Sequence, residues 1–322
     1  MRNLIAIVVA TIAIGIHQRR RQWDSNIATL VNELLVEKAN RAIKTFPSIS
    51  THQEWEDIPP VVQRYLNRAL PSSKSSSLNK QIRSVRFRQT GQFQFNGNWV
   101  PFEAQQVVSS NQPGFVWDAQ VFLGGGRWLS VQVCDAWSNG KGHLEASFMK
   151  VLTVASSSSQ DMQGQEQQLM LLIGEALRWL AETPLIPTVL LPSAGIVSWG
   201  QTHNKNNSMA KLNLPPSYAG GPSDEMTINV TFDPIESWMT TVRCRRPNKE
   251  PTGQFSWKDF EGYFSNYQPQ EDGILWVPTH MECGWLSDST GEVDLYFKCD
   301  NYDLTYEWID EHPSASFAIQ KD

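Results

Sequence analysis

The chain has 322 residues, of which 40% are hydrophobic and 19% are charged, a balance that suits a folded protein and excludes wholesale disorder. The net charge is -6, with no long basic block beyond Arg19 to Arg21, which argues against nucleic acid as a partner. The chain carries 13 tryptophans, and an excess of Trp is typical of sheet cores, ligand pockets and membrane interfaces.

The amino terminus carries an apolar run from Leu4 to Ile16, with Arg2 before it and Arg19 to Arg21 after it. The run is shorter than the roughly 20 residues that span a bilayer and has the length of a signal-peptide core. Because no small-residue cleavage site follows, we predict an uncleaved membrane anchor over residues 1–21; a signal peptide with an atypical flank is the alternative. The side of the membrane stays open, although the positive-inside rule favours the cytoplasmic side for the domain.

Residues 22–78 are predicted to form a helical region and a linker. Between Asp24 and Phe46, apolar residues recur at intervals of three and four, which indicates an amphipathic helix. Pro59 and Pro60 suit the first turn of a second, short helix, which ends at Pro71. The polar stretch 72–77 is typical of a linker.

From residue 79 onward the apolar period changes to two, which indicates β-strands. Phe93 and Phe95 alternate with Gln92 and Gln94, and Asn96-Gly97 then suits a tight hairpin turn. Residues 215–224 and 246–253 are rich in Pro and Gly and are predicted loops. Further strands are predicted at 99–108, 115–121, 129–133, 143–154, 196–202, 209–214, 226–232, 238–244, 274–285, 293–297 and 302–308.

One long helix interrupts these strands at about 165–182, where Leu169, Ile173, Ala176 and Leu180 form an apolar stripe. The segment 184–192 is apolar but contains three prolines, so we expect a packed loop. The sequence therefore predicts an α+β fold, in which a large curved, mostly antiparallel sheet of about eleven strands cups a central helix. Residues 79–322 are assigned to this single β domain.

Several motifs from Ile58 onward resemble an uncharacterised, mainly prokaryotic family of membrane-anchored proteins, a domain of unknown function. The likeness covers about 140 residues and fades beyond Trp199. It is carried by residues 59–66 (PPVVQRYL), 91–93 (GQF), 99–106 (WVPFEAQQ), 115–117 (FVW), Asp135, 174–182 (GEALRWLAE) and 187–192 (PTVLLP). The resemblance implies a plan similar to the half-barrel lipoprotein-carrier fold, with an apolar cavity between sheet and helices, and it brings no catalytic residues.

A charged stripe of Glu175, Arg178 and Glu182 lies opposite the apolar stripe of the central helix. It is either a solvated face with helical ion pairs or a face that looks into the hollow of the sheet and fixes the polar end of a ligand. In the second case Trp residues would line an apolar cavity. The predicted ligand-binding residues are Glu175, Arg178, Trp179, Glu182, Trp117, Trp128 and Trp199.

The sequence supports a catalytic role more weakly than a binding role. Asp135, Glu175 and Glu182 are candidates for a pair of acid and base carboxylates, as in a hydrolase, but the sequence fixes no distance between them. The chain has no nucleophile elbow, dinucleotide-binding glycine motif or Walker loop, and its histidines are scattered singly, so we predict no metal and no cofactor. The four cysteines are expected to be buried thiols, with a bridge between Cys283 and Cys299 as the alternative in an oxidising compartment.

The sequence thus predicts a membrane-associated domain that binds an apolar or lipid-like molecule without catalysis. One alternative is a structural module that interacts through an exposed strand edge or the carboxy-terminal strands, which would require an apolar surface patch. The other is a carboxylate-dependent hydrolase.

Overall fold

The computed structural model describes residues 2–36, 55–71, 80–110, 112–124, 129–138, 140–160, 162, 164–202, 208–215, 218, 226–250, 252–287 and 289–310. Among these residues, 13 strands form one sheet. The strands are β1 (Lys80–Phe95), β2 (Asn98–Ser109), β3 (Gly114–Phe122), β4 (Ser130–Ser138), β5 (Lys141–Phe148), β6 (Leu152–Ser158), β7 (Ser198–Gln201), β8 (Met209–Asn213), β9 (Thr227–Phe232), β10 (Met239–Lys249), β11 (Phe255–Gln270), β12 (Leu275–Leu286) and β13 (Val293–Asp310).

The sheet consists of two antiparallel meanders that are joined in the middle by the first and last strands. Its order is β6-β5-β4-β3-β2-β1-β13-β12-β11-β10-β9-β8-β7, and the pairing of β1 with β13 places Gln89 opposite Asn301 and Phe93 opposite Phe297. The edge strands β6 and β7 are not paired with each other, so the sheet is open. The predicted α+β fold with a dominant antiparallel sheet is confirmed.

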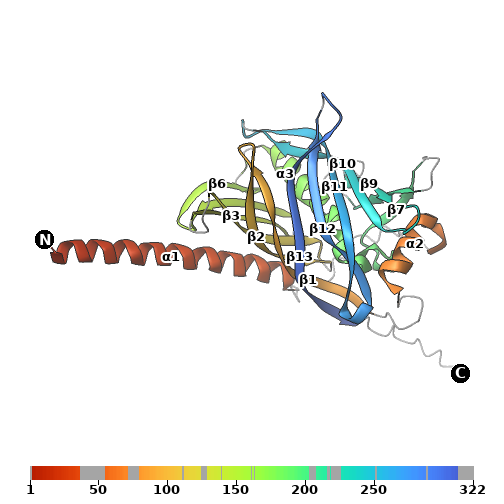
Figure 1. The fold of residues 1–322 in the computed structure, drawn as a ribbon, viewed down its shortest axis with the longest axis horizontal. Coiled ribbons are helices and arrows are strands. Elements are labelled where there is room, and N and C mark those ends of the chain that lie inside the picture. Colours follow the sequence, from red (N-terminus) through yellow and green to blue (C-terminus); the bar gives the residue numbers. More distant parts are fainter. Residues whose placement is uncertain are drawn as a thin grey trace, which may run out of the picture.

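Helix α3 (Gln165–Ala181) lies in the hollow of this sheet. The helix contacts β3, β4 and β5 of the first meander and also β9, β10 and β11 of the second. Because these strands stand toward opposite ends of the sheet order, the sheet has to curve around α3 to reach it from both sides (Figure 1). The resulting architecture is a half-barrel around a helix.

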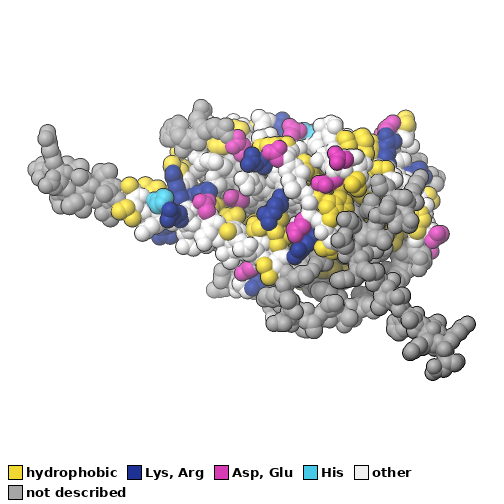
Figure 2. Space-filling view, turned by 90° about the horizontal axis from the view of Figure 1, so that it is seen from below, with side chains coloured by type: hydrophobic (Ala, Val, Ile, Leu, Met, Phe, Trp, Pro, Cys, Tyr) yellow, Lys and Arg dark blue, Asp and Glu magenta, His cyan; other side chains and the backbone are white. Residues whose placement is uncertain are grey.

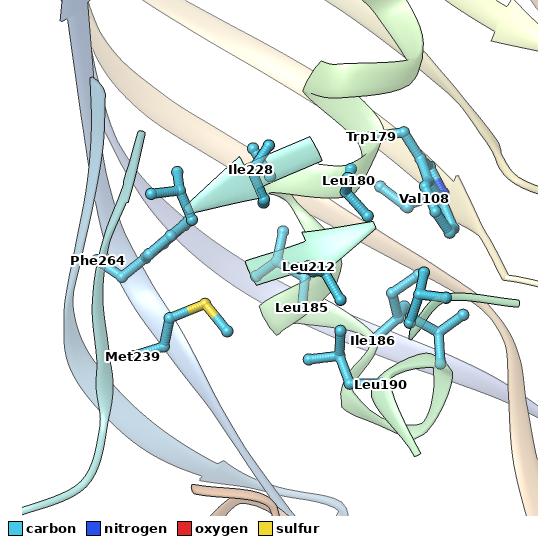
Figure 3. Close-up of a cluster of buried hydrophobic side chains, with 14 of the residues drawn as sticks. Val108, Trp179, Leu180, Leu185, Ile186, Leu190, Leu212, Ile228, Met239 and Phe264 are labelled. Atoms are coloured by element: carbon cyan, nitrogen blue, oxygen red, sulfur yellow. The ribbon is translucent and has the colours of Figure 1, made fainter. Parts of the chain in front are cut away.

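Beyond α3, three short 3₁₀ turns fill one part of the hollow: η3 (Thr183–Leu185), η4 (Pro187–Leu190) and η5 (Pro192–Ala194). Figure 3 shows Leu185, Ile186 and Leu190 from these turns beside Leu180 and Trp179 of α3. All five side chains are fully buried. The segment predicted as a packed loop is therefore the centre of the apolar core, and its prolines prevent it from continuing as a helix or strand.

Two further helices flank the sheet. Helix α1 (Arg2–Leu35) packs its carboxy-terminal half against the convex face, where Trp23 and Leu34 contact Val107 and Val116 of β2 and β3. Helix α2 (Pro60–Ala69), preceded by the turn η1 (Trp55–Asp57), buries its predicted apolar face near β8 and β12. Figure 1 shows the amino-terminal half of α1 projecting from the body of the molecule.

The predicted helix 24–46 differs in its bounds from α1. The observed helix runs without a break from Arg2 across residue 21, and residues 37–46 lie outside the described part of the chain. In the part of the chain that the structure describes, no helix combines the length and the apolar character required to cross a membrane. Attachment to a membrane through residues 1–21 stays a prediction.

Several strand predictions were wrong. Strand β11 was not predicted, because Gly262 interrupts its inward series between Phe260 and Phe264. The strand predicted at 143–154 is two strands, since Met149 and Lys150 adopt positive φ in the turn between β5 and β6. Residues 246–249 extend β10 and do not form a loop. The strands predicted at 293–297 and 302–308 are the single strand β13.

Candidate functional site

A cavity of about 240 Å³ lies between α3 and the concave face of the sheet. Its residues come from α3 and from nine strands of both meanders, β1 to β5 and β10 to β13, so the curvature of the sheet creates it. The apolar part of its wall is formed by Phe93, Trp117, Val133, Leu144, Ala181, Val242, Phe260, Gly262, Phe264, Met281 and Phe297. Its polar and ionisable side chains are Gln89, Gln106, Asp135, Arg178, Glu182, Arg246, Glu282, Cys283 and Tyr296.

Arg178 of α3 is the centre of a buried ion-pair cluster in this wall. Its Nε donates to Glu182 Oε1 at 2.9 Å, one helical turn later, and its Nη1 donates to Asp135 Oδ2 on β4. The guanidinium also lies over the ring of Phe115 at 4.3 Å and near that of Trp117 at 5.4 Å. The side chains of Arg178, Asp135 and Glu182 are only 13–18% exposed. A charge group this buried needs such pairing, because an uncompensated buried charge is costly.

Polar side chains of the central strands extend this cluster. Trp117 Nε1 donates to Gln89 Oε1 at 2.7 Å, and Gln89 Nε2 donates to Asn301 Oδ1 at 2.9 Å. Gln106 Nε2 donates to Glu182 Oε2, so the carboxylate of Glu182 is held from both α3 and β2. These bonds fix the orientation of the Trp117 indole, one face of the cavity wall.

Glu175, one turn before Arg178, lies close to this cluster but does not line the cavity. Burial, followed by the negative charge of Asp135, raises the pKa of this carboxyl to about 8, against the lowering effect of Arg246 and Arg178. Its Oε2 atom is buried and has no hydrogen-bond partner within the described residues. The carboxyl of Glu175 is therefore mostly protonated at neutral pH.

The cavity also contains a second guanidinium, that of Arg246 on β10. Its Nε donates to the carbonyl oxygen of Gly174 on α3 at 3.1 Å, and the group lies 5.2 Å from the ring of Phe260. Arg246 was not among the predicted binding residues, because residues 246–253 were predicted to form a loop. Strand alternation would have revealed it, since Val242 and Cys244 are buried and Arg246 follows with the same period of two.

The predicted binding residues fall into three groups. Trp117, Arg178 and Glu182 line the cavity. Trp179 and Trp199 do not: Trp179 is completely buried with its Nε1 bonded to the Ser109 carbonyl, and Trp199 Nε1 is bonded to the Leu190 carbonyl. Both are core side chains whose N–H groups are satisfied by backbone oxygens. Glu175 lies behind the cavity wall, and Trp128 lies outside the described residues.

The candidate catalytic carboxylates are not arranged as a free acid and base. Asp135 and Glu182 both bind the guanidinium of Arg178, and Glu175 has no access to the cavity. The described residues contain no cluster of His, Cys, Asp and Glu that would hold a metal ion. Cys134, Cys244, Cys283 and Cys299 are free thiols; Cys283 lies opposite Phe297 and Cys299 opposite Met281, so the alternative bridge does not form here.

The fold and the site define an open antiparallel half-barrel with one helix and a partly apolar cavity in its hollow. The chain belongs to the family of unknown function DUF6920, whose model matches residues 56–306. This confirms the resemblance to an uncharacterised family that the motifs between residues 59 and 192 indicated. Among proteins of curated function, none matches the chain.

The chain is similar to solved structures at low identity. One is a DUF1329 family protein from Desulfovibrio piger, with a TM-score of 0.36, 8% identity, and coverage of 76% of this chain and 93% of the other. Another is a putative outer membrane lipoprotein-sorting protein domain from Vibrio parahaemolyticus, with a TM-score of 0.35 and the same identity and coverage. A third is a β-barrel-like DUF1849 protein from Brucella abortus, with a TM-score of 0.24, 12% identity, and coverage of 70% and 99%.

Proposed function

We propose that this protein binds a small apolar or amphipathic molecule in the cavity between α3 and the curved sheet. The observation that supports this proposal most is the cavity itself, about 240 Å³ in size and walled largely by aromatic and aliphatic side chains. A dry cavity of roughly 150 Å³ already suffices for benzene. The few polar groups in the wall are fixed by hydrogen bonds, as is usual in sites that orient a ligand.

We infer a binding role ahead of a catalytic one. Each carboxylate of the Arg178 cluster already accepts a hydrogen bond from the guanidinium, so neither is free to act on a ligand. The cluster is better suited to holding the wall of the cavity together than to transferring protons.

Filling the cavity tests the proposal. The test variant is Val133→Phe, because Val133 is a half-buried residue of the cavity wall. The control is Val154→Phe, because Val154 is 57% exposed on the edge strand β6. We expect the unsubstituted chain and the control to bind the fluorescent probe N-phenyl-1-naphthylamine in a saturable way. Val133→Phe should bind it at least several-fold more weakly, with an unchanged circular dichroism spectrum. Equal binding by both variants would contradict the proposal.

We also propose that the protein works at a membrane surface, to which the projecting half of α1 attaches it. Ile14 is 57% exposed and Ile16 is 36% exposed, and Arg19 to Arg21 are exposed just behind them. Figure 2 shows this combination of apolar and basic side chains on the projecting helix. Exposed apolar residues beside arginines favour the interface of an anionic bilayer.

Sedimentation with vesicles of phosphatidylglycerol and phosphatidylcholine measures this attachment. We expect the full chain to sediment with the vesicles and the double variant Ile14→Ser with Ile16→Ser to remain mostly in the supernatant. The matched control replaces the exposed Leu152 and Val154 of β6 with Ser and should sediment like the unsubstituted chain. If removing the two isoleucines has no effect, Ile14 and Ile16 do not contribute to the attachment.

A further inference from the structure

The two guanidinium groups of the cavity differ in how their charges are compensated. Arg178 binds two carboxylates, those of Asp135 and Glu182. Arg246 donates one hydrogen bond, to a backbone carbonyl, and forms no ion pair within the described ranges of the chain. Arg246 is thus a cation that lines the cavity and forms no ion pair with a carboxylate of the described residues.

The groups closest to Arg246 electrostatically do not supply the missing charge. They are Tyr296, Glu175, Cys244 and Arg178. Burial raises the pKa of the Tyr296 hydroxyl and raises that of the Cys244 thiol to about 12, so both are neutral at pH 7. Burial also raises the pKa of the Glu175 carboxyl to about 8, so it is mostly protonated at pH 7. Arg178 adds a further positive charge.

Apart from Cys283 and from Glu282, whose carboxylate contacts His280, the rest of the cavity wall near β10 to β12 is apolar. Val242, Phe264 and Met281 line it and are buried, and Phe260 lies beneath the guanidinium of Arg246. The volume of about 240 Å³ lies below the roughly 300–1,000 Å³ of sites for drug-sized ligands. It therefore suits one hydrocarbon chain and does not suit a lipid with two or three chains.

From this geometry we infer that the ligand is a single-chain amphiphile with an anionic head, whose carboxylate or phosphate pairs with Arg246 while its chain lies against Phe264 and Met281. This inference rests on the proposed function, since it names the ligand class of the same cavity. A guanidinium recognises both kinds of anion through parallel N–H···O bonds, and the low dielectric of the cavity strengthens them.

Displacement of the bound naphthylamine probe at pH 7 tests the inference with four ligands of equal chain length: decanoate, decyl phosphate, decanol and decylamine. For the unsubstituted chain we expect at least one of the two anions to bind roughly tenfold tighter than decanol, or more, with decylamine the weakest. The tighter of the two anions identifies the head group. The preference should vanish in Arg246→Gln and persist in part in Arg246→Lys.

Arg245→Gln is the matched control, because Arg245 is the adjacent residue of β10 and is exposed on the opposite face. It should retain the full preference for the anion. Equal affinities for decanoate, decyl phosphate and decanol in the unsubstituted chain would overturn the inference and leave the proposed function intact. Failure of the probe and of all four ligands to bind would instead overturn the proposed function. Because the order of affinities is measured first on the unsubstituted chain, the test does not depend on the folding of Arg246→Gln.

Discussion

Glu175 combines burial with a missing hydrogen-bond partner. The residue is 7% exposed, and its pKa of about 8 lies above the ordinary value of 4.5. Between about pH 4.5 and pH 8, the folded state therefore keeps a proton on Glu175 that the unfolded chain has already released. The contribution of this group to the free energy of unfolding is present at low pH and is lost as the pH rises through that window.

Replacing Glu175 by Gln, its neutral isostere, removes this pH dependence of the free energy of unfolding. We expect Glu175→Gln to gain stability relative to the unsubstituted chain as the pH rises from 5 to 8.5, by an amount of a few kcal/mol, because each pKa unit corresponds to about 1.4 kcal/mol. Urea unfolding at pH 5, 6.5 and 8.5 measures the difference. Glu166→Gln is the control, since Glu166 is exposed in the first turn of the same helix. Identical pH profiles for Glu175→Gln and the unsubstituted chain would refute this account.

Part of the site could be predicted residue by residue, and part could not. Helical spacing alone brought Glu175, Arg178 and Glu182 to one side of α3, and two of the three reach the cavity. The tryptophans were predicted from composition, which gives no direction to a side chain, and Trp179 and Trp199 proved to be core residues. The partners Gln89 and Asn301 lie 212 positions apart in sequence, a separation over which local patterns carry no information.

At the scale of elements, the sequence is informative where one face is buried and the other is not. Such an element has a period, and α2 and β9 were predicted for that reason. Strand β6 has a mostly exposed pattern and β11 has Gly262 in its inward series, so neither shows the expected alternation.

The close approach of neighbouring strands also explains why Gly91 is a glycine, which the apolar pattern of the sequence does not reveal. Gly91 of β1 lies between β2 and β13, where a Cβ would collide with the carbonyl oxygen of Lys298 and come within 2.8 Å of Cys299 Cα. This contact sits at the joint between the two meanders. A glycine inside a strand commonly marks a place where another backbone comes close, but the strand pairing is needed to identify that backbone.

Two features connect the two meanders into one molecule. One is the pairing of β1 with β13, and the other is α3, which contacts strands of both meanders. The turns around Leu185 and Leu190 fill one part of the hollow (Figure 3), and the cavity lies in another part. Curvature follows from contacts between distant segments, so the sequence indicated it only indirectly, through the combination of many strands with one central helix and through the family resemblance. The alternative of a structural module with a contiguous apolar surface patch is less favoured, because the exposed large apolar residues of the described chain are dispersed over α1, β1, β2, β6, β13 and three connecting segments.

A crystal structure of the full chain grown with decanoate is the most direct test of the account. We predict electron density for one extended chain between α3 and the sheet, beside Phe264 and Met281, with its carboxylate within hydrogen-bond distance of Arg246. A hollow filled by side chains, or decanoate bound only on the outer surface of the sheet, would contradict the central claim that this half-barrel holds a ligand.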